Sequence, residues 1–247
     1  RSSGWSRPSV YRDFGFDEVY FEGDFQDREY MRGDEKTGYV TDQCDYENLI
    51  RWYEEKEAGE PLFLFNVTMQ NHSAYQMAWT NLPREVWLTG ALEGRFNTVN
   101  QYLSLVYQSD QAFEYLLDYF SQVDRPVMLV FVGDHLPSLN LSDGVSLYTH
   151  LGYSPTEEAA DWDPETLENI LSTDYLIWTN YEAQAAPDRM ESCTFLGLHT
   201  LQRAGIPLNQ YFSWLDREVA SHMLLSRRTL FVDQDGKGTY SPSQEDQ

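Results

Sequence analysis

Three short apolar runs divide the chain into strand-sized pieces. They span residues 61–69, 126–134 and 174–180. The first two runs are nearly continuous rather than alternating, which is typical of strands buried on both faces of a parallel sheet. Each run begins at a proline or an aspartate and ends in polar residues, which limits it to the length of a strand.

A long amphipathic stretch separates the first two runs. From residue 97 to residue 122, apolar side chains recur at steps of three and four, which predicts a helix with one buried face. A strand, a helix and a second strand form a βαβ unit, so the pattern predicts an α/β fold.

Shorter elements fill the rest of the chain. Apolar spacing predicts helices over residues 45–58, 164–171, 193–204 and 209–225. Asp163 followed by Pro164 indicates a helix start, with the aspartate as N-cap and the proline in the first turn. Residues 229–232 and 239–240 flank a turn rich in Asp and Gly, which favours a β-hairpin.

Composition narrows the class of protein. The 247 residues are 41% hydrophobic and 15% aromatic, which excludes a wholly disordered chain. The net charge of −23 repels phosphate groups, so direct binding of nucleic acid is excluded. No run of 18 apolar residues is present, so no segment of these 247 residues is expected to span a membrane. Cys44 and Cys193 show no zinc-binding spacing, and whether they pair is left open.

Histidine-bearing segments follow the first two apolar runs. His72 comes shortly after the first run, and Asp134 and His135 come at the end of the second. Because the carboxyl ends of parallel strands meet at one edge of a sheet, we expect all three side chains near one crevice. An adjacent aspartate and histidine suit a hard or borderline divalent metal, although two ligands are too few for a complete site.

A structural interpretation of these residues remains open beside the functional one. Asp134 would then cap the next segment, His135 would be an ordinary loop residue, and His72 would only support the fold. Spacing alone does not decide between the two interpretations.

Four segments resemble the lipoteichoic acid synthase and phosphoglycerol transferase family, which are sulfatase-like enzymes of the alkaline phosphatase superfamily. Residues 65–75 resemble the family's Asn-His-x-x-Tyr segment, and residues 130–137 resemble its Gly-Asp-His motif. Residues 5–16 are similar to the stretch whose Trp and Arg line the substrate pocket, and residues 173–181 resemble a late strand.

The resemblance covers about residues 4–240 and implies a fold. That fold is an alkaline-phosphatase or sulfatase-like sheet with flanking helices, here without its N-terminal strands, plus a small C-terminal β-hairpin region. It implies one partial catalytic domain over residues 1–240 and a frayed tail over residues 241–247.

The resemblance also implies roles for individual residues. Asp134 and His135 would bind a catalytic divalent ion, typically manganese, with magnesium and zinc as alternatives. His72 would hydrogen-bond the phosphoryl group or the departing group. Trp5 and Arg7 would contact glycerol phosphate, since the planar guanidinium can hold a phosphate with two bonds. A pair packed on the surface is the alternative for Trp5 and Arg7.

One part of the family pattern has no counterpart in these residues. The family's nucleophilic Thr and a further acidic metal ligand precede the Trp-x-Arg stretch, as do its membrane helices. No residue here matches either group, so we expect a piece of a longer enzyme that by itself binds metal weakly and turns over no substrate.

The implied activity belongs to the parent protein. It would move glycerol phosphate from a phosphatidylglycerol-like lipid to a cell-envelope polymer or glycan through a phospho-threonine intermediate. The work would take place on the extracellular face of a bacterial cell membrane, with attachment through the absent N-terminal helices. The alternatives are a sulfatase or phosphodiesterase-type hydrolase of the same superfamily, and a non-catalytic domain that binds anionic glycans.

Overall fold

The structure is a computed structural model. It describes residues 6–75, 78–139, 144–183, 190–219, 223–225, 230–232 and 238–240. The chain divides into two compact units, Arg1–Tyr119 and Phe120–Gln247, and each unit is described by itself.

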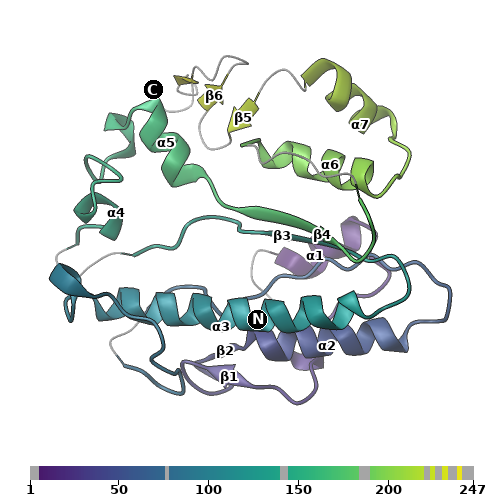
Figure 1. Cartoon of the computed structure of the whole chain (residues 1–247), viewed down its shortest axis with the longest axis horizontal. Coiled ribbons are helices and arrows are strands. Elements are labelled where there is room, and N and C mark those ends of the chain that lie inside the picture. Colours follow the sequence, from purple (N-terminus) through teal and green to yellow (C-terminus); the bar gives the residue numbers. More distant parts are fainter. Residues whose placement is uncertain are drawn as a thin grey trace. The chain divides into compact units, whose positions relative to one another are not determined.

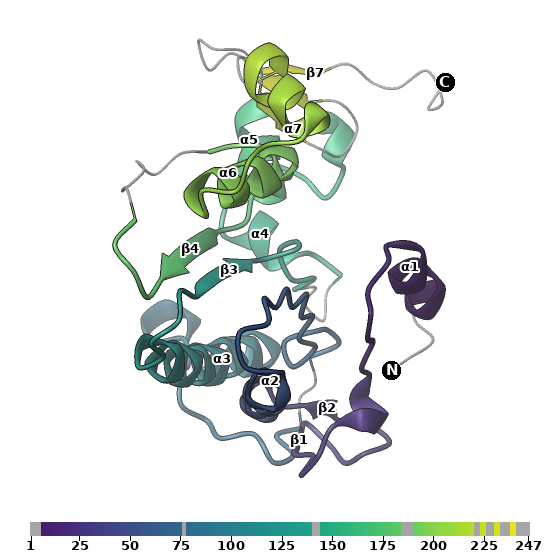
Figure 2. The same ribbon diagram turned by 90° about the vertical axis from the view of Figure 1, so that its right-hand side faces the viewer.

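The first unit is built around two helices. Its elements are α1 (Arg7–Asp13), η2 (Glu22–Asp24), β1 (Tyr30–Met31), β2 (Tyr39–Val40), α2 (Asp42–Glu55), η3 (Gly90–Leu92) and α3 (Asn97–Ser121), which ends just past the boundary between the units. Strands β1 and β2 pair antiparallel. Helices α2 and α3 lie side by side in both views (Figures 1 and 2).

Helix α2 begins where the sequence provides a cap. The Thr41 side chain accepts a hydrogen bond from the Cys44 backbone N–H at 3.1 Å, which satisfies one of the free amides of the first turn. Along the facing helix, Leu105 is fully buried and packs with Met31 and Leu82. Burial of this apolar face fixes the first unit.

The second unit contains two small sheets and several short helices. Its elements are β3 (Met128–Val132), α4 (Leu147–His150), η4 (Ala159–Asp161), α5 (Pro164–Leu171), β4 (Tyr175–Thr179), η5 (Cys193–Phe195), α6 (Leu196–Arg203), α7 (Gln210–Trp214), η6 (Leu215–Val219), β5 (Met223–Leu225), β6 (Leu230–Val232) and β7 (Gly238–Tyr240). Strands β3 and β4 pair antiparallel, with Val130 opposite Ile177. The second sheet has the order β5-β6-β7. A buried cluster of Phe195, Leu198 and Leu215 packs η5, α6 and η6 together.

Several sequence predictions are confirmed. The α/β class holds, and α3 covers the helix predicted over residues 97–122. Helix α5 spans residues 164–171 as predicted, and Asp163 accepts a hydrogen bond from the Thr166 N–H at 2.8 Å. The predicted C-terminal hairpin is the β6–β7 pair.

The predicted parallel pairing is wrong in two respects. Residues 61–69 form no strand, and the partner of β3 is the antiparallel strand β4. The side chains of β3 are not buried on both faces either, since Phe131 is 43% exposed and Val132 is 48% exposed. A continuous apolar run gives strand length, but whether a strand forms depends on which backbone lies beside it.

Helix boundaries also differ from the prediction. Helix α2 spans Asp42–Glu55, so it begins and ends three residues before the predicted range of 45–58. The helix predicted to run to residue 225 ends with η6, and residues 223–225 form strand β5 instead. Short apolar segments do not distinguish a helix from a strand, and pairing with β6 satisfies the backbone of β5.

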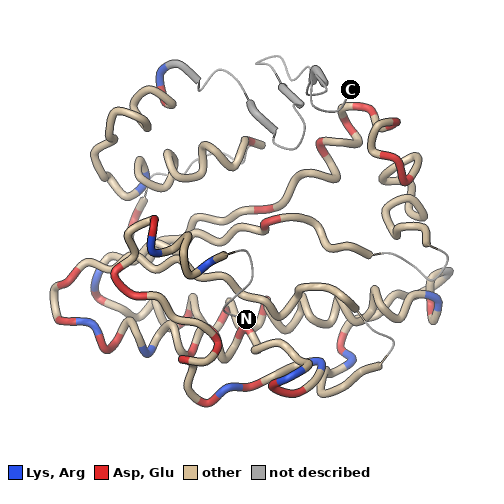
Figure 3. Tube along the Cα trace, turned by 180° about the vertical axis from the view of Figure 1, so that it is seen from behind, with Lys and Arg blue, Asp and Glu red and all other residues tan. Residues whose placement is uncertain are grey.

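Charge and cysteines complete the description. Figure 3 shows Asp and Glu spread over helices and loops of both units rather than gathered in one segment. Cys44 and Cys193 are both free thiols. None of the helices in the described part of the chain combines the length and apolarity needed to cross a membrane. The tail predicted over residues 241–247 lies outside the described residues.

Candidate functional site

His72 presents one ring nitrogen to solvent. It lies in the loop after the first apolar run, and its backbone N–H donates to the Met69 carbonyl at 3.1 Å. Its Nδ1 lies 2.7 Å from the Ser73 carbonyl oxygen. Because a carbonyl oxygen can only accept, Nδ1 carries the proton. The exposed side chain therefore offers Nε2 to a ligand.

A buried polar layer anchors this loop to α2 and α3. The Gln70 Oε1 accepts from the Asp42 backbone N–H at 3.0 Å, and its Nε2 donates to the Leu105 carbonyl at 3.2 Å and to the Ser109 Oγ at 3.0 Å. Asn71 donates to the same Ser109 hydroxyl at 2.9 Å. The loop before His72 is thereby held by side chains from two helices.

Two buried carboxyl groups lie in that layer. Asp42 is 3% exposed and Asp45 is 6% exposed, one helical turn apart at the start of α2. Burial raises the pKa of Asp42 to about 6 and that of Asp45 to about 7. The Ser109 hydroxyl donates to Asp42 at 2.5 Å, and the Asn66 amide donates to Asp45 at 2.5 Å. These bonds offset part of the cost of burying charge.

The Gly133-Asp134-His135 segment is fixed against the start of β4. The Gly133 carbonyl accepts from the Thr173 hydroxyl at 2.7 Å, and its N–H donates to the Asp174 carbonyl at 3.2 Å. A Cβ atom at position 133 would lie 3.2 Å from the Thr173 Cβ. The close approach explains why glycine suits this position.

Asp134 and His135 bring two possible metal-binding atoms close to each other. The His135 Nε2 lies 3.5 Å from the Asp134 Oδ2, and both side chains are exposed. The His135 Nδ1 lies 2.9 Å from the Leu136 carbonyl oxygen, so that nitrogen carries the proton and the lone pair of Nε2 can bind a metal. Asp134 caps no helix among the described residues, and its Oδ1 accepts from the next backbone N–H at 2.9 Å.

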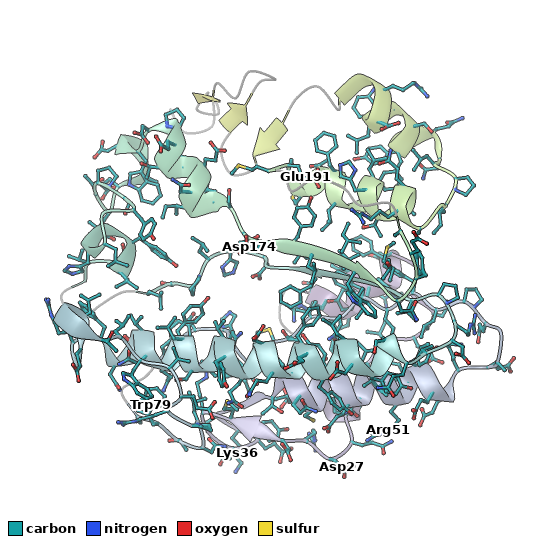
Figure 4. All side chains as sticks on the ribbon, in the orientation of Figure 1. Asp27, Lys36, Arg51, Trp79, Asp174 and Glu191 are labelled. Atoms are coloured by element: carbon teal, nitrogen blue, oxygen red, sulfur yellow. The ribbon has the colours of Figure 1, made fainter. Side chains whose placement is uncertain are left out.

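This pair fits two positions of a divalent metal site. A histidine that binds a metal through one nitrogen usually donates the other to a carbonyl or carboxylate, as His135 does. Asp174, labelled in Figure 4 at the start of β4, is held beside Gly133 through its backbone. Within the described ranges, however, no three His, Cys, Asp or Glu side chains converge. A bound ion would therefore need further ligands.

The other predicted residues lie apart from this pair in the chain. Arg7 is the first residue of α1 and is partly exposed, and Trp5 lies outside the described residues. His72 belongs to the first unit, and Asp134 and His135 belong to the second. The prediction that His72, Asp134 and His135 lie near one crevice stays a prediction.

Sequence reasoning missed three residues that shape the His72 loop. Asp42 and Asp45 follow a helix cap, a position where acidic residues usually face solvent and favour the helix dipole. Arg32 lies about 40 positions before the loop whose carbonyls it binds. No local pattern signals such a contact, although an Arg-Gly pair after a strand indicates a turn.

Comparison with a known family gives a match over most of the chain. The model described as Sulfatase matches residues 1–206. A Rhizobium meliloti (strain 1021) protein named for cyclic beta-1,2-glucan modification is 28% identical over 236 residues, which covers 94% of this chain and 35% of that protein. The capsular polysaccharide biosynthesis protein RkpI of the same strain is 33% identical over 101 residues, covering 41% of this chain and 16% of its own length.

A solved structure shares the fold. The phosphoglycerol transferase GacH of Streptococcus pyogenes, in complex with sn-glycerol-1-phosphate, superposes with a TM-score of 0.64 at 18% sequence identity. The alignment covers 92% of this chain and 54% of the other. The chain thus spans about a third of the first curated relative and about half of this structural neighbour.

Proposed function

Because the chain belongs to the sulfatase family, we propose that it is part of a transferase that moves glycerol phosphate to a cell-envelope polymer or glycan. The observation that carries the proposal is the Asp134–His135 pair, whose Nε2 and Oδ2 lie 3.5 Å apart at the end of β3. The fold shared with a phosphoglycerol transferase supports the reaction class. Relatives named for glucan modification and capsular polysaccharide biosynthesis support a glycan acceptor.

In this proposal each site residue has one task. Asp134 and His135 hold a divalent ion, manganese before magnesium or zinc, together with ligands from the rest of the parent protein. When bound, such an ion supplies positive charge that stabilises the phosphoryl oxygens. His72 hydrogen-bonds the phosphoryl group or the departing group through Nε2, which accepts when Nδ1 alone carries a proton and donates when both ring nitrogens are protonated. Trp5 and Arg7 bind the glycerol phosphate.

The transfer proceeds in two displacements at phosphorus. A threonine hydroxyl outside these 247 residues forms a bond to phosphorus, the bond to the diacylglycerol oxygen breaks, and that oxygen takes a proton. An acceptor hydroxyl then forms the second bond, and the threonine oxygen leaves with a proton. Phosphatidylglycerol-like lipid is the donor, and the reaction takes place on the outer face of the bacterial membrane.

The test is product identity with the full-length parent. The protein is incubated with head-group-labelled phosphatidylglycerol and a glycan acceptor, with and without manganese. We expect label on the acceptor, and a loss on the order of 100-fold or more in His135→Ala and Asp134→Asn. His150→Ala is the matched control, since His150 is an exposed histidine of the same unit.

Other outcomes would replace the proposal. Label released as free glycerol phosphate would indicate a hydrolase of the same superfamily. Retention of glycan without any turnover would indicate a binding domain. Equal losses in His150→Ala and His135→Ala would show that the metal pair has no special part.

A further inference from the structure

Arg32 binds the loop that carries His72 through three carbonyl oxygens. One guanidinium nitrogen, Nη2, lies 2.7 Å from the Gln70 carbonyl and 2.7 Å from the His72 carbonyl. The other, Nη1, lies 3.3 Å from the Ala74 carbonyl. The planar fork of arginine can reach several acceptors at once, which a lysine ammonium on a flexible stem does less well. One side chain thus ties together both sides of His72.

Aromatic rings enclose the same guanidinium. Its central carbon lies 4.6 Å from the centroid of the Tyr39 ring and 5.7 Å from that of Tyr75. The Tyr39 ring is also 6.1 Å from the His72 ring, and its hydroxyl donates to the Ser73 carbonyl at 3.0 Å. Ring faces attract a cation, so both tyrosines favour the observed position of Arg32.

The positive charge of Arg32 has no carboxylate partner in the described part of the chain. The guanidinium contacts carbonyl oxygens and aromatic rings instead. Burial lowers its pKa. Arg32 is partly buried, and an arginine removed from water normally pairs with an acid because desolvation is costly. An unpaired positive charge beside His72 suits a loop that faces an anionic group.

The backbone at Arg32 is held in an unfavourable conformation. Arg32 has φ of 61°, in the left-handed region where non-glycine residues are uncommon. Asn81 braces the turn, because its amide donates to the Tyr30 and Gly33 carbonyls at 2.6 and 3.0 Å and its Oδ1 accepts from the Gly33 N–H at 2.9 Å. Strain held by such surrounding bonds is a feature of functional sites.

The next turn residues complete the brace. A Cβ atom at Gly33 would lie 2.3 Å from the Thr37 Oγ1, so that position requires glycine. Asp34 accepts from the N–H groups of Lys36 and Thr37 at 2.9 and 3.1 Å. Figure 4 labels Lys36 in this turn. These contacts hold the turn in the conformation that directs the Arg32 side chain toward the His72 loop.

We propose that Arg32 is a positioning residue that fixes the His72 loop, so that the imidazolium form of His72 can donate a hydrogen bond from Nε2 to an anionic phosphoryl group. The proposal deepens the proposed function, because the phosphoryl group is that of glycerol phosphate. The order of the His72 loop can be measured on this chain without any activity.

The test follows the His72 ring by nuclear magnetic resonance. The variants are Arg32→Met, Arg32→Lys and the control Arg28→Met, which removes an arginine of the same unit that pairs with Glu35 at 3.4 Å. In the unsubstituted chain, the ring 15N shifts of His72 should report a protonated Nδ1. We expect Arg32→Met to lose that signature and to speed exchange of the His72 amide by on the order of tenfold or more. Arg32→Lys should give intermediate values, and Arg28→Met none of these changes.

Two results would overturn the inference. One is a His72 signature in Arg32→Met and Arg32→Lys that equals that of the unsubstituted chain. The other is an equal change in Arg28→Met. Should Arg32→Met fail to fold, the Arg32→Lys ring shifts and amide exchange decide the matter by the same criteria.

Activity of the full-length parent separates this inference from the proposed function. If Arg32 orders the loop but no glycerol phosphate is transferred, the proposed function fails and the positioning role stands. If transfer occurs, Arg32→Lys should lower kcat more than it raises KM, because the loop rather than substrate affinity is disturbed.

Discussion

His72 and His135 make the same local hydrogen bond although they lie in different units. In each, Nδ1 donates to the carbonyl of the following residue, at 2.7 Å in His72 and 2.9 Å in His135. This bond fixes the tautomer and leaves Nε2 with a free electron pair. Composition and spacing place the two histidines after apolar runs, but the tautomer depends on ring orientation, which sequence does not encode locally.

The buried carboxyl of Asp45 makes stability depend on pH. Its pKa is raised from 3.8 to about 7 by burial, so its protonated form contributes stability that is fully present below pH 3.8 and is lost as the pH rises through about 7. Asp45→Asn keeps the Oδ1 that accepts from Asn66 and removes the charge. We expect it to raise the free energy of unfolding by about 2 kcal/mol at about pH 8, with little change at about pH 4.

Urea unfolding followed by tryptophan fluorescence measures this difference. Asp110→Asn is the control, since Asp110 is an exposed aspartate of the neighbouring helix α3. If the free energy of unfolding differs between Asp45→Asn and the unsubstituted chain by the same amount at every pH, ionisation of Asp45 costs no stability.

At the scale of elements, the sequence predicts helices that depend on nearby residues and misses strands and contacts that depend on distant backbone. Helices α3 and α5 were predictable because apolar spacing and the Asp163-Pro164 start act within a few residues. The run over residues 61–69 was misassigned because a strand needs a neighbouring backbone. Arg32 was missed for the same reason, since its three acceptors lie about 40 residues away.

The connection from α3 to β3 depends on one amide side chain. The Asn180 Nδ2 donates to the carbonyls of Phe120, Val123 and Arg125 at 3.1, 2.8 and 2.9 Å, and its Oδ1 accepts from the Val127 N–H at 2.8 Å. Asn180→Ala leaves four backbone groups without this partner. We expect a loss of about 2 kcal/mol in the free energy of unfolding.

Thermal or urea unfolding compares Asn180→Ala with Asn169→Ala, which alters an exposed asparagine in α5. The control should change stability by less than about 0.5 kcal/mol. Similar losses in the two variants would contradict the role of Asn180 as the clamp of this connection.

The turn after β3 sets the position of Asp134 and His135. Because a Cβ at position 133 would meet the Thr173 Cβ at 3.2 Å, Gly133→Ala should push this turn away from β4. We expect a loss of about 1 kcal/mol in stability and shifted amide resonances at Asp134 and His135. Gly23→Ala, where a Cβ meets no atom within 4 Å, is the control. Unshifted resonances at both residues would mean that the turn tolerates the methyl group.

At the scale of the whole molecule, charge opposes the proposed substrate. The net charge of −23 repels an anionic membrane, and the acidic residues are spread over the chain rather than gathered in one segment (Figure 3). Positive charge near the His72 loop comes from Arg32, which is held without a carboxylate partner among the described residues. The net charge of the molecule therefore repels an anionic substrate, whereas the charge of Arg32 beside the His72 loop attracts one.

This combination predicts how the chain behaves toward lipid vesicles. At neutral pH and low ionic strength, the chain should not sediment with phosphatidylglycerol vesicles, because long-range repulsion is least screened there. Lowering the pH toward the sequence pI of about 4.3 removes the net charge, so any binding that repulsion prevents should then appear. Vesicles of phosphatidylcholine, which carry no net charge, control for binding through apolar side chains. Sedimentation with phosphatidylglycerol at neutral pH would show instead that a local basic surface overcomes the −23, and Arg32→Met would then be the first variant to measure.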